Sequence, residues 1–350
     1  MRYLKNAWYV AAISREIKQG ELLSRKLFDQ KMIFYRTSAG RPVAMMDRCP
    51  HRFAPLSMGR VEGDEVVCHY HGLKFDCTGS CTHNPHGDGK IPNRAVVTTY
   101  PTVERFGLVW LWAGEPEAAD PDTIPPYEAI DDGPETGVGY GYIKMECNYE
   151  LIADNVMDLS HVDFIHGPLI YTGGNLAPQK PAFSDHGDSV VTGWNWVQQQ
   201  PMGLFNDFLP QPDTPARHFV QVTWRAPCNM VVHVGATQED GNGYDEALES
   251  RDHHMMTPET EYSTHYFMVS RRNYLVDNAE YNEGKINGMM QAFLEEDAPV
   301  VAAIQKEMGD LTIDEMRPAY LAGDPGPVLC RKKLARLIDR EIDEGIMATA

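Results

Sequence analysis

The sequence predicts an α+β protein, in which an N-terminal all-β module precedes a larger domain with helices packed on an antiparallel sheet. Three observations predict this class. Short strand-like runs separated by glycine and proline fill residues 1 to about 118. A proline-rich, acidic segment without periodicity, residues 114–128, has the composition of a linker. Beyond it, a strand-rich block has helical segments at both ends, an order typical of α+β domains. We therefore expect one domain over residues 1–118 and a second over residues 119–350.

The strands expected in the first domain are short runs rich in Val, Tyr and Trp, bounded by turn residues. Gly59, Gly63 and Gly79 are examples of these turn residues. Examples of such runs are residues 31–37, 42–48, 65–70, 95–104 and 108–114.

The second domain is expected to begin with a strand over residues 139–150 and a helix over residues 151–164. Later strands are separated by polar or glycine-rich loops, and two long helices follow them. The last helix is amphipathic, so we expect one side of it to pack on the domain or on another subunit. The later strands are residues 190–198, 218–225, 229–237 and 262–270, and the later helices are residues 280–307 and 329–345.

Composition excludes several classes of function. The 350 residues are 43% hydrophobic and 23% charged, which is ordinary for a globular chain. A net charge of −19 disfavours nonspecific binding to nucleic acid or to anionic lipid. The first residues, MRYLKNAWYVAA, lack the apolar core of a signal peptide, and no apolar run reaches the 18 residues of a membrane span. Seven cysteines without a secretion signal suit a reducing compartment. We expect a cytoplasmic protein without structural disulfides and with no nucleic-acid or membrane partner.

Two short motifs in the first domain carry metal-ligand chemistry. Cys49 and His51 form a C-x-H motif, and Cys68 and His71 form a C-x-x-H motif. Zinc could use all four side chains in one tetrahedral site, but zinc motifs more often pair like residues. A Rieske [2Fe–2S] cluster places both thiolates on one iron and both histidines on the other. The flanking glycines and prolines suit tight loops around such a cluster, with His71 rather than His69 as the second imidazole ligand.

A second constellation lies in the helix expected over residues 151–164. Residues three apart share a helix face, so Asn155, Asp158 and His161 are expected to line one side. His166 lies about 140° from His161 on a regular helix, so the two converge only if the helix distorts or ends between them. Pro168 favours such an end. The alternative interpretation is a polar helix face with two surface histidines.

A third ligand for this constellation is expected to be a carboxylate, because two histidines and one carboxylate leave open positions on non-haem Fe(II). Asp297 is the candidate, since it falls within an apolar stripe and a buried, unpaired carboxylate is costly. Pro299 should distort the helix beside it. Glu295 and Glu296 are expected to be solvated. The apolar stripe consists of Met290, Phe293, Leu294, Val301 and Ile304.

Six segments resemble the oxygenase component of the Rieske non-haem iron oxygenases, and the resemblance extends over essentially the whole chain. They are KNAWYVAA, CPHRFAPLS, CHYHGLKFD, VERFGLVWLW, DNVMDLSHVDFIH and MTPET. The branch that the chain resembles most is that of the aromatic O-demethylases, typified by the vanillate and dicamba enzymes. The resemblance implies a Rieske [2Fe–2S] domain at residues 1–118 and a catalytic domain with mononuclear Fe(II) at residues 119–350.

The resemblance also implies a route for electrons. A separate NAD(P)H-dependent reductase, directly or through a ferredoxin, would reduce the cluster. Asp158 would then link a cluster histidine of one subunit to an iron histidine of the next, so that electrons pass from His71 to His161. This arrangement implies a homotrimer with head-to-tail contacts that close into a ring. Asn155 occupies a position that lies near the iron in this family. Neither a dinucleotide-binding nor a P-loop motif occurs in this chain, so its electrons must come from a partner.

The implied reaction uses O2 to hydroxylate the methyl group of a methoxylated aromatic acid, which then loses formaldehyde. Related enzymes of this branch N-dealkylate amides or hydroxylate aryl methyl groups, and these reactions are the alternatives. A Rieske ferredoxin would leave the second constellation unexplained. A zinc-binding hydrolase or structural zinc protein would be colourless and would need no reductase.

The substrate-binding residues are the least defined by the sequence. His254 matches the place of a substrate-contacting histidine in the dicamba enzyme, although it could also be a surface histidine before a turn. His233 and Asn229 belong to an apolar strand and face either a pocket or the core. Residues 170–215 depart from the vanillate and dicamba enzymes, so they bear on the choice of substrate. Cations for an acidic substrate could be Arg217, Arg225 or Arg251, and rings that could clamp it are Phe205, Phe208 and Trp196.

Overall fold

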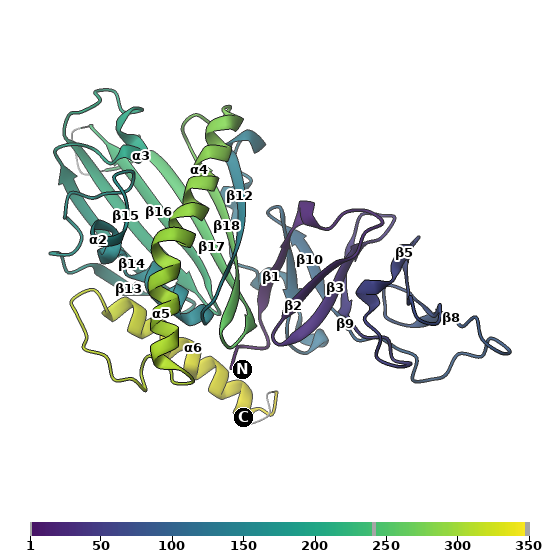
Figure 1. Ribbon diagram of the computed structural model, residues 1–350. Helices are drawn as coiled ribbons and strands as arrows, with labels where there is room; N and C mark the ends of the chain where they lie inside the picture. Colours follow the sequence, from purple (N-terminus) through teal and green to yellow (C-terminus); the bar gives the residue numbers. More distant parts are fainter. Residues whose placement is uncertain (1, 240–242, 347–350) are drawn as a thin grey trace. The chain divides into compact units, whose positions relative to one another are not determined.

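The structure is a computed structural model that describes residues 2–239 and 243–346 (Figure 1). The chain divides into two compact units, each with its own set of strands. Unit 1 consists of Met1–Ile124, Thr257–Thr260 and Glu341–Ala350, and unit 2 consists of Pro125–Met256 and Glu261–Arg340.

Unit 1 is built mainly from short antiparallel strands. They are β1 (Trp8–Ile13), β2 (Leu23–Leu27), β3 (Gln30–Arg36), β4 (Pro42–Met46), β5 (Arg60–Glu62), β6 (Glu65–Val67), β7 (Lys74–Phe75), β8 (Cys81–His83), β9 (Thr99–Tyr100), β10 (Thr102–Arg105) and β11 (Leu108–Trp112). These strands form three sheets, with the orders β1-β11-β10, β2-β3-β4-β9 and β5-β6-β7-β8. Short 3-10 turns lie between these strands at Ser14–Glu16 and Leu56–Met58 and after them at Pro116–Ala118 and Pro121–Thr123.

A hydrophobic core within unit 1 holds both candidate cluster thiols. Cys49 and Cys68 are buried there with Ile33, Tyr35 and Phe75, whose side chains are almost inaccessible to solvent. Because Ile33 and Tyr35 come from β3, the sheet β2-β3-β4-β9 helps to position the loops that carry the cysteines.

Unit 2 is organised around one antiparallel sheet. Its strands are β12 (Val138–Met145), β13 (Ala182–Asp185), β14 (Ser189–Gln198), β15 (Ala216–Arg225), β16 (Asn229–Thr237), β17 (Leu248–Thr260) and β18 (Ser263–Arg272). They follow the order β12-β18-β17-β16-β15-β14-β13. Side chains alternate between the two faces of a strand. Val232 and Val234 of β16 therefore share one face, and His233 points to the other.

Helices pack on one face of this sheet (Figure 1). They are α1 (Tyr149–Met157), α2 (Val162–Ile165), α3 (Gly203–Asn206), α4 (Ala279–Ala292), α5 (Ala298–Met308) and α6 (Pro325–Asp343), with a π-helical turn at Phe293–Asp297. Further 3-10 turns are Glu128–Ile130, Glu135–Gly137 and Leu159–His161. Helix α4 lies close to β12 because Gly139 and Gly141 lack side chains, and a Cβ at either glycine would meet Ile286 or Met290 at 3.0 Å or less. The helix-covered antiparallel sheet confirms the predicted α+β class.

Strand β17 was absent from the sequence-based expectation. The segment includes Glu249, Arg251 and Asp252, and its polar side chains hide the alternation that marks a strand. Asp252 is nevertheless buried, because Lys285 of α4 pairs with it. No helix within residues 2–239 and 243–346 is long and apolar enough to cross a membrane.

Candidate functional site

The two cysteine motifs of unit 1 fold into matching loops. Cys49 N–H donates to the carbonyl of Ala54, and Cys49 C=O accepts from Phe53 N–H. In the second loop, Cys68 N–H donates to the carbonyl of Leu73, and Cys68 C=O accepts from Gly72 N–H. The residue four after each cysteine has a positive φ, 60° at Phe53 and 71° at Gly72. Because the same pattern of backbone hydrogen bonds closes both loops, the two loops have similar backbone conformations.

The donor atoms of these loops are arranged as a cluster requires. Both cysteines are buried, whereas His51 is exposed and His71 is half-buried. The imidazole rings of His51 and His71 lie 4.5 Å apart, between centroids. Burial raises the pKa of the Cys49 thiol to about 11. Its thiolate form therefore needs adjacent positive charge, which the ferric ions of an iron–sulfur cluster supply, and the residues fit a [2Fe–2S] group with its histidine side toward the surface.

In unit 2, the helix expected over residues 151–164 is interrupted at Asp158. Helix α1 ends at Met157, and Asp158 adopts an extended backbone with φ −112° and ψ 95°. The Asp158 carboxylate accepts a hydrogen bond from Ser160 N–H at 3.0 Å and so caps the turn that carries His161. The expectation that Asn155, Asp158 and His161 share one continuous helix face is therefore wrong, because a cap at Asp158 starts a new element.

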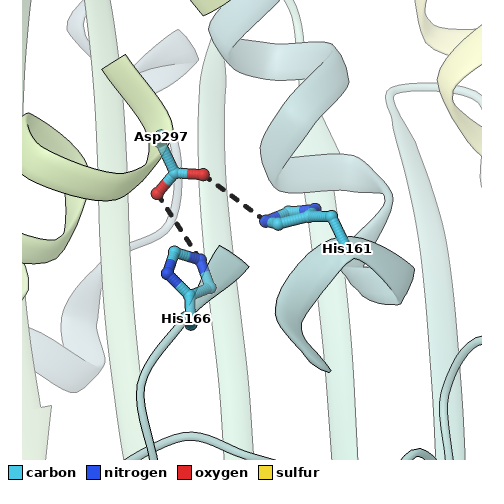
Figure 2. A group of neighbouring side chains, drawn as sticks. All are labelled: His161, His166 and Asp297. Carbon is cyan, nitrogen blue, oxygen red and sulfur yellow. Dashed lines mark ion pairs between the residues drawn. The ribbon is translucent and has the colours of Figure 1, made fainter. Parts of the chain in front are cut away.

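The interruption brings three candidate iron ligands together (Figure 2). Nε2 of His161 lies 3.5 Å from Oδ1 of Asp297, and Nε2 of His166 lies 3.5 Å from Oδ2 of Asp297. One ligand atom from each residue lies within 4.8 Å of the other two. Two imidazoles and one carboxylate directed at a common point form the facial set that non-haem Fe(II) uses, with coordination positions left open.

The hydrogen bonds of both histidines direct their Nε2 atoms toward the metal position. Nδ1 of His161 donates to the backbone carbonyl of Asp158 at 2.6 Å, because a carbonyl can only accept. Nδ1 of His166 lies 2.6 Å from Oε2 of Glu296. With Nδ1 as the donor in each ring, Nε2 keeps the lone pair that a metal needs, as is usual for metal-bound histidine.

Glu296 was expected to be solvated, but it is only partly exposed and its carboxylate contacts His166. The reason is the local helix geometry. Residues Phe293–Asp297 form a π-helical turn, which is the form that the expected distortion near Pro299 takes. A regular α-helix would place neighbouring side chains about 100° apart, but here both Glu296 and Asp297 reach the histidines. Glu295, in contrast, is exposed as expected.

The surroundings of the triad favour a bound cation. Asp297 is 1% exposed, and burial raises the pKa of its carboxyl although His166, His161 and Asn155 oppose that shift. Burial likewise lowers the pKa of His161. Asn155 donates from Nδ2 to Oδ1 of Asp297 at 3.0 Å and so holds the carboxylate in place. A divalent ion would stabilise both the ionised carboxylate and the neutral imidazoles, so these residues fit iron.

A cavity of about 410 Å³ adjoins the triad and lies between the sheet and the helices of unit 2. His161, His166 and Asp297 line it, as does Asn155. Its other walls are mainly apolar and come from several elements, among them Leu159, Met202, Leu204, Val220, Val232, Val234, Met289 and Phe293. This size and apolar character suit a small organic ligand.

Of His254, His233 and Asn229, the structure places only His254 at this cavity. His254 is buried and lies 2.7 Å from the Tyr266 hydroxyl through Nδ1. His233 faces the other side of the sheet, where its Nε2 lies 3.0 Å from Oε2 of Glu249. Asn229 is buried and shares that orientation along β16, because it lies four residues before His233. Neither His233 nor Asn229 lines the cavity.

Of the other side chains that the sequence suggested for substrate binding, some line the cavity and others lie away from it. Trp196 lines the cavity, whereas Phe205 and Phe208 pack against Tyr274. The three arginines lie away from the cavity and contact acceptors elsewhere: Arg217 the Glu239 carbonyl, Arg225 the Asp188 carboxylate and Arg251 the Glu249 carboxylate. One lysine that the sequence did not single out, Lys285, lines the cavity. In the sequence, Lys285 appeared only as one charged residue of the segment that forms helix α4.

Comparisons with known proteins agree with both sites. Residues 7–101 match the Rieske [2Fe–2S] domain family, and residues 145–340 match the vanillate O-demethylase oxygenase C-terminal domain family. The oxygenase component of dicamba O-demethylase from Stenotrophomonas maltophilia is 35% identical over 96% of this chain and 98% of its own length. The oxygenase component of chloroacetanilide N-alkylformylase from Rhizorhabdus wittichii is 36% identical over 97% of each chain.

A solved structure shows the same fold. The crystal structure of dicamba monooxygenase bound to dicamba is 33% identical, has a TM-score of 0.89, and matches over 98% of this chain and 100% of that one. The two family matches thus cover both sets of candidate metal ligands. The chain therefore belongs to the Rieske non-haem iron oxygenases, as an oxygenase component related to the dicamba and vanillate O-demethylases.

Proposed function

We propose that this oxygenase removes the methyl group of a methoxylated aromatic compound, using O2 and electrons from a separate NAD(P)H-dependent reductase. The observation that carries this proposal is the position of the His161, His166 and Asp297 triad in the wall of an apolar cavity. The oxygenase component of a dicamba O-demethylase is similar over nearly the whole chain, which supports the same reaction here.

The overall reaction balances as two steps. The methyl ether, O2, two protons and two electrons give a hydroxymethyl ether and water, and the hydroxymethyl ether then separates into a phenol and formaldehyde. Bound iron would supply the activation of O2 for attack on the C–H bond.

The protein residues supply the geometry for this reaction. His161 and His166 present Nε2 because their Nδ1 atoms are engaged, and Asn155 holds one oxygen of Asp297. The apolar walls would exclude water and hold the aromatic ring, so that only the methyl group approaches the metal position. His254 offers one polar contact at the cavity wall.

We further propose that Asp158 carries electrons between subunits of a head-to-tail homotrimer, with a ferredoxin as an optional carrier before the cluster. Asp158 supports this role because its carbonyl oxygen contacts the iron ligand His161 directly. A trimer would have a mass of about three times the 39.4 kDa chain, which light scattering after gel filtration measures. We also propose a cytoplasmic location.

N-dealkylation is a second candidate, because the relative that is 36% identical is a chloroacetanilide N-alkylformylase. The same cavity could present a carbon bound to nitrogen instead of oxygen. The two candidates differ in substrate and share the step of C–H hydroxylation.

A single-turnover experiment tests the proposed function. Protein with both metals loaded is reduced by dithionite, freed from excess reductant, mixed with a methoxylated aromatic compound and exposed to O2. We expect formaldehyde and the matching phenol in equal amounts, and neither product from Asp297→Ala protein. Oxidation of the cluster without formaldehyde from a panel of methoxylated rings, but with dealkylation of N-alkyl anilides, would select the second candidate.

A further inference from the structure

The cavity beside the triad has an uneven charge. Four carboxylates line it, from Asp252, Glu295, Glu296 and Asp297, against one cation, Lys285. Among the residues that the structure describes, no arginine lines it. A divalent iron ion would still leave the formal charge of this lining negative. Because like charges repel more strongly in a partly desolvated pocket, an anionic substrate is disfavoured from the start.

Lys285 cannot compensate for this charge, because the protein already uses its donors. Nζ donates to Oδ1 of Asp252 at 2.8 Å and to the hydroxyl oxygens of Ser250 and Ser270 at 2.5 Å each. An ammonium group has three N–H donors, so none remains for a substrate carboxylate. The Lys285 side chain is 7% exposed, so the network is also shielded from water.

The other polar groups at the wall are neutral or already engaged. Thr172 donates its hydroxyl hydrogen to Asp163, and Asn155 donates to Asp297. Burial lowers the pKa of His254 to about 4, so this ring is neutral near pH 7. Since its Nδ1 contacts the Tyr266 hydroxyl, Nε2 is the ring nitrogen available for one neutral hydrogen bond to a ligand.

Building on the proposed function, we propose that the substrate is an uncharged aryl methyl ether, held by apolar contacts and one hydrogen bond to His254. The resemblance had suggested an aromatic acid, but a carboxylate entering this cavity would find no unpaired cation among the described lining residues. Taking an ion out of water without a partner lowers its affinity by more than about tenfold, which is enough to reverse the preference between two ligands of equal shape.

A matched pair of ligands tests this inference. 4-Nitroanisole and 4-methoxybenzoate share ring, methoxy group and a planar two-oxygen substituent, but only the benzoate is charged. Binding to the metal-loaded protein is measured by calorimetry without O2 at pH 7. We expect the Kd of 4-nitroanisole to be at least about tenfold lower than that of 4-methoxybenzoate. Equal or tighter binding of the benzoate would overturn the inference.

A charge reversal at the cavity provides a second test. Glu295 is exposed and lines the cavity, so Glu295→Lys can alter its charge with little risk to folding. We expect the Kd of 4-methoxybenzoate to fall several-fold while that of 4-nitroanisole stays constant. The control is Glu283→Lys, an exposed residue of the preceding helix α4 that does not line the cavity, and we expect no change for either ligand. An unchanged benzoate Kd in Glu295→Lys would refute the role of cavity charge.

Formaldehyde release, scored separately, distinguishes this inference from the proposed function. If 4-nitroanisole binds more tightly but a single turnover yields no formaldehyde from any methyl ether, O-demethylation fails while the charge preference stands. If 4-methoxybenzoate binds more tightly and yields formaldehyde, O-demethylation stands and the inference fails.

Discussion

Glu296 offers the most direct test of how the iron site is held. Its carboxylate lies 2.6 Å from Nδ1 of His166, a short, charge-assisted contact that fixes the ring and its tautomer. Removing such a partner of a metal-bound histidine typically costs 10- to 100-fold in metal affinity. The Glu296 side chain is 34% exposed, so water screens part of the charge. For Glu296→Gln we therefore expect the low end, a Kd for Fe(II) about tenfold higher, or about 1.4 kcal/mol.

The assay uses protein whose cluster is intact and whose mononuclear site has been emptied. Fe(II) is titrated anaerobically in competition with a coloured chelator, and the visible spectrum of the cluster reports that unit 1 remains folded. Glu295→Gln is the matched control, because Glu295 is adjacent in sequence but accepts a hydrogen bond from Gln291 and not from a candidate iron ligand. The Fe(II) affinity of this control should match the wild type. Equal affinities for the wild-type and Glu296→Gln proteins would refute the claim that Glu296 supports His166.

Three further perturbations test individual contacts of unit 2. Asp297→Ala should lose the mononuclear iron and keep the cluster, so iron analysis should fall from three to two atoms per chain; a third iron retained at the site would show that another carboxylate binds it. Asp158→Asn should keep both metals but slow oxidation of the reduced cluster by O2 and substrate, which stopped-flow absorbance measures. Because the backbone contact to His161 is unchanged in this variant, unimpaired turnover would exclude electron transfer through the Asp158 carboxylate. Lys285→Met should lower the free energy of unfolding at pH 7 by about 3–5 kcal/mol in urea titrations, because it leaves Asp252 buried without its cation. Burial alone would raise the pKa of Asp252, but Lys285 holds it below its ordinary value. The stabilisation from this pair is thus present above the unfolded pKa of Asp252 and is lost as the pH falls through the folded pKa. The difference in free energy of unfolding between the wild-type and Lys285→Met proteins should therefore become smaller at acidic pH. A difference that does not change with pH would exclude the ion pair as its source.

The candidate metal ligands could be identified in the sequence because their chemistry is local. The pairs Cys49 with His51 and Cys68 with His71 each lie within one loop, so their spacing indicated a shared metal site, and the flanking segments favoured a cluster over zinc. Asp297 was identified from a different signal, a carboxylate within an apolar stripe. Not every residue of that stripe is buried, since Leu294 is 47% exposed, but Asp297 is buried as the stripe predicted.

The features that the sequence did not predict depend on backbone irregularity or on distant partners. The cap at Asp158 and the π-helical turn at Phe293–Asp297 both depart from regular helix geometry, on which the helix-face argument relied. Glu296 was missed for that reason. Strand β17 and Lys285 were missed because Asp252 and Lys285, 33 residues apart, are acceptable in the interior only as a pair.

The π-helical turn also has a consequence for insertions and deletions. A regular helix through Phe293–Asp297 would need one residue fewer, so deleting one residue inside the turn would give a regular helix and leave the phase of α5 unchanged. Such a deletion would keep the helix intact but remove the wide turn through which both Glu296 and Asp297 reach the histidines. The length of the chain at this point is thus constrained by the candidate iron site and not by the stability of the helix.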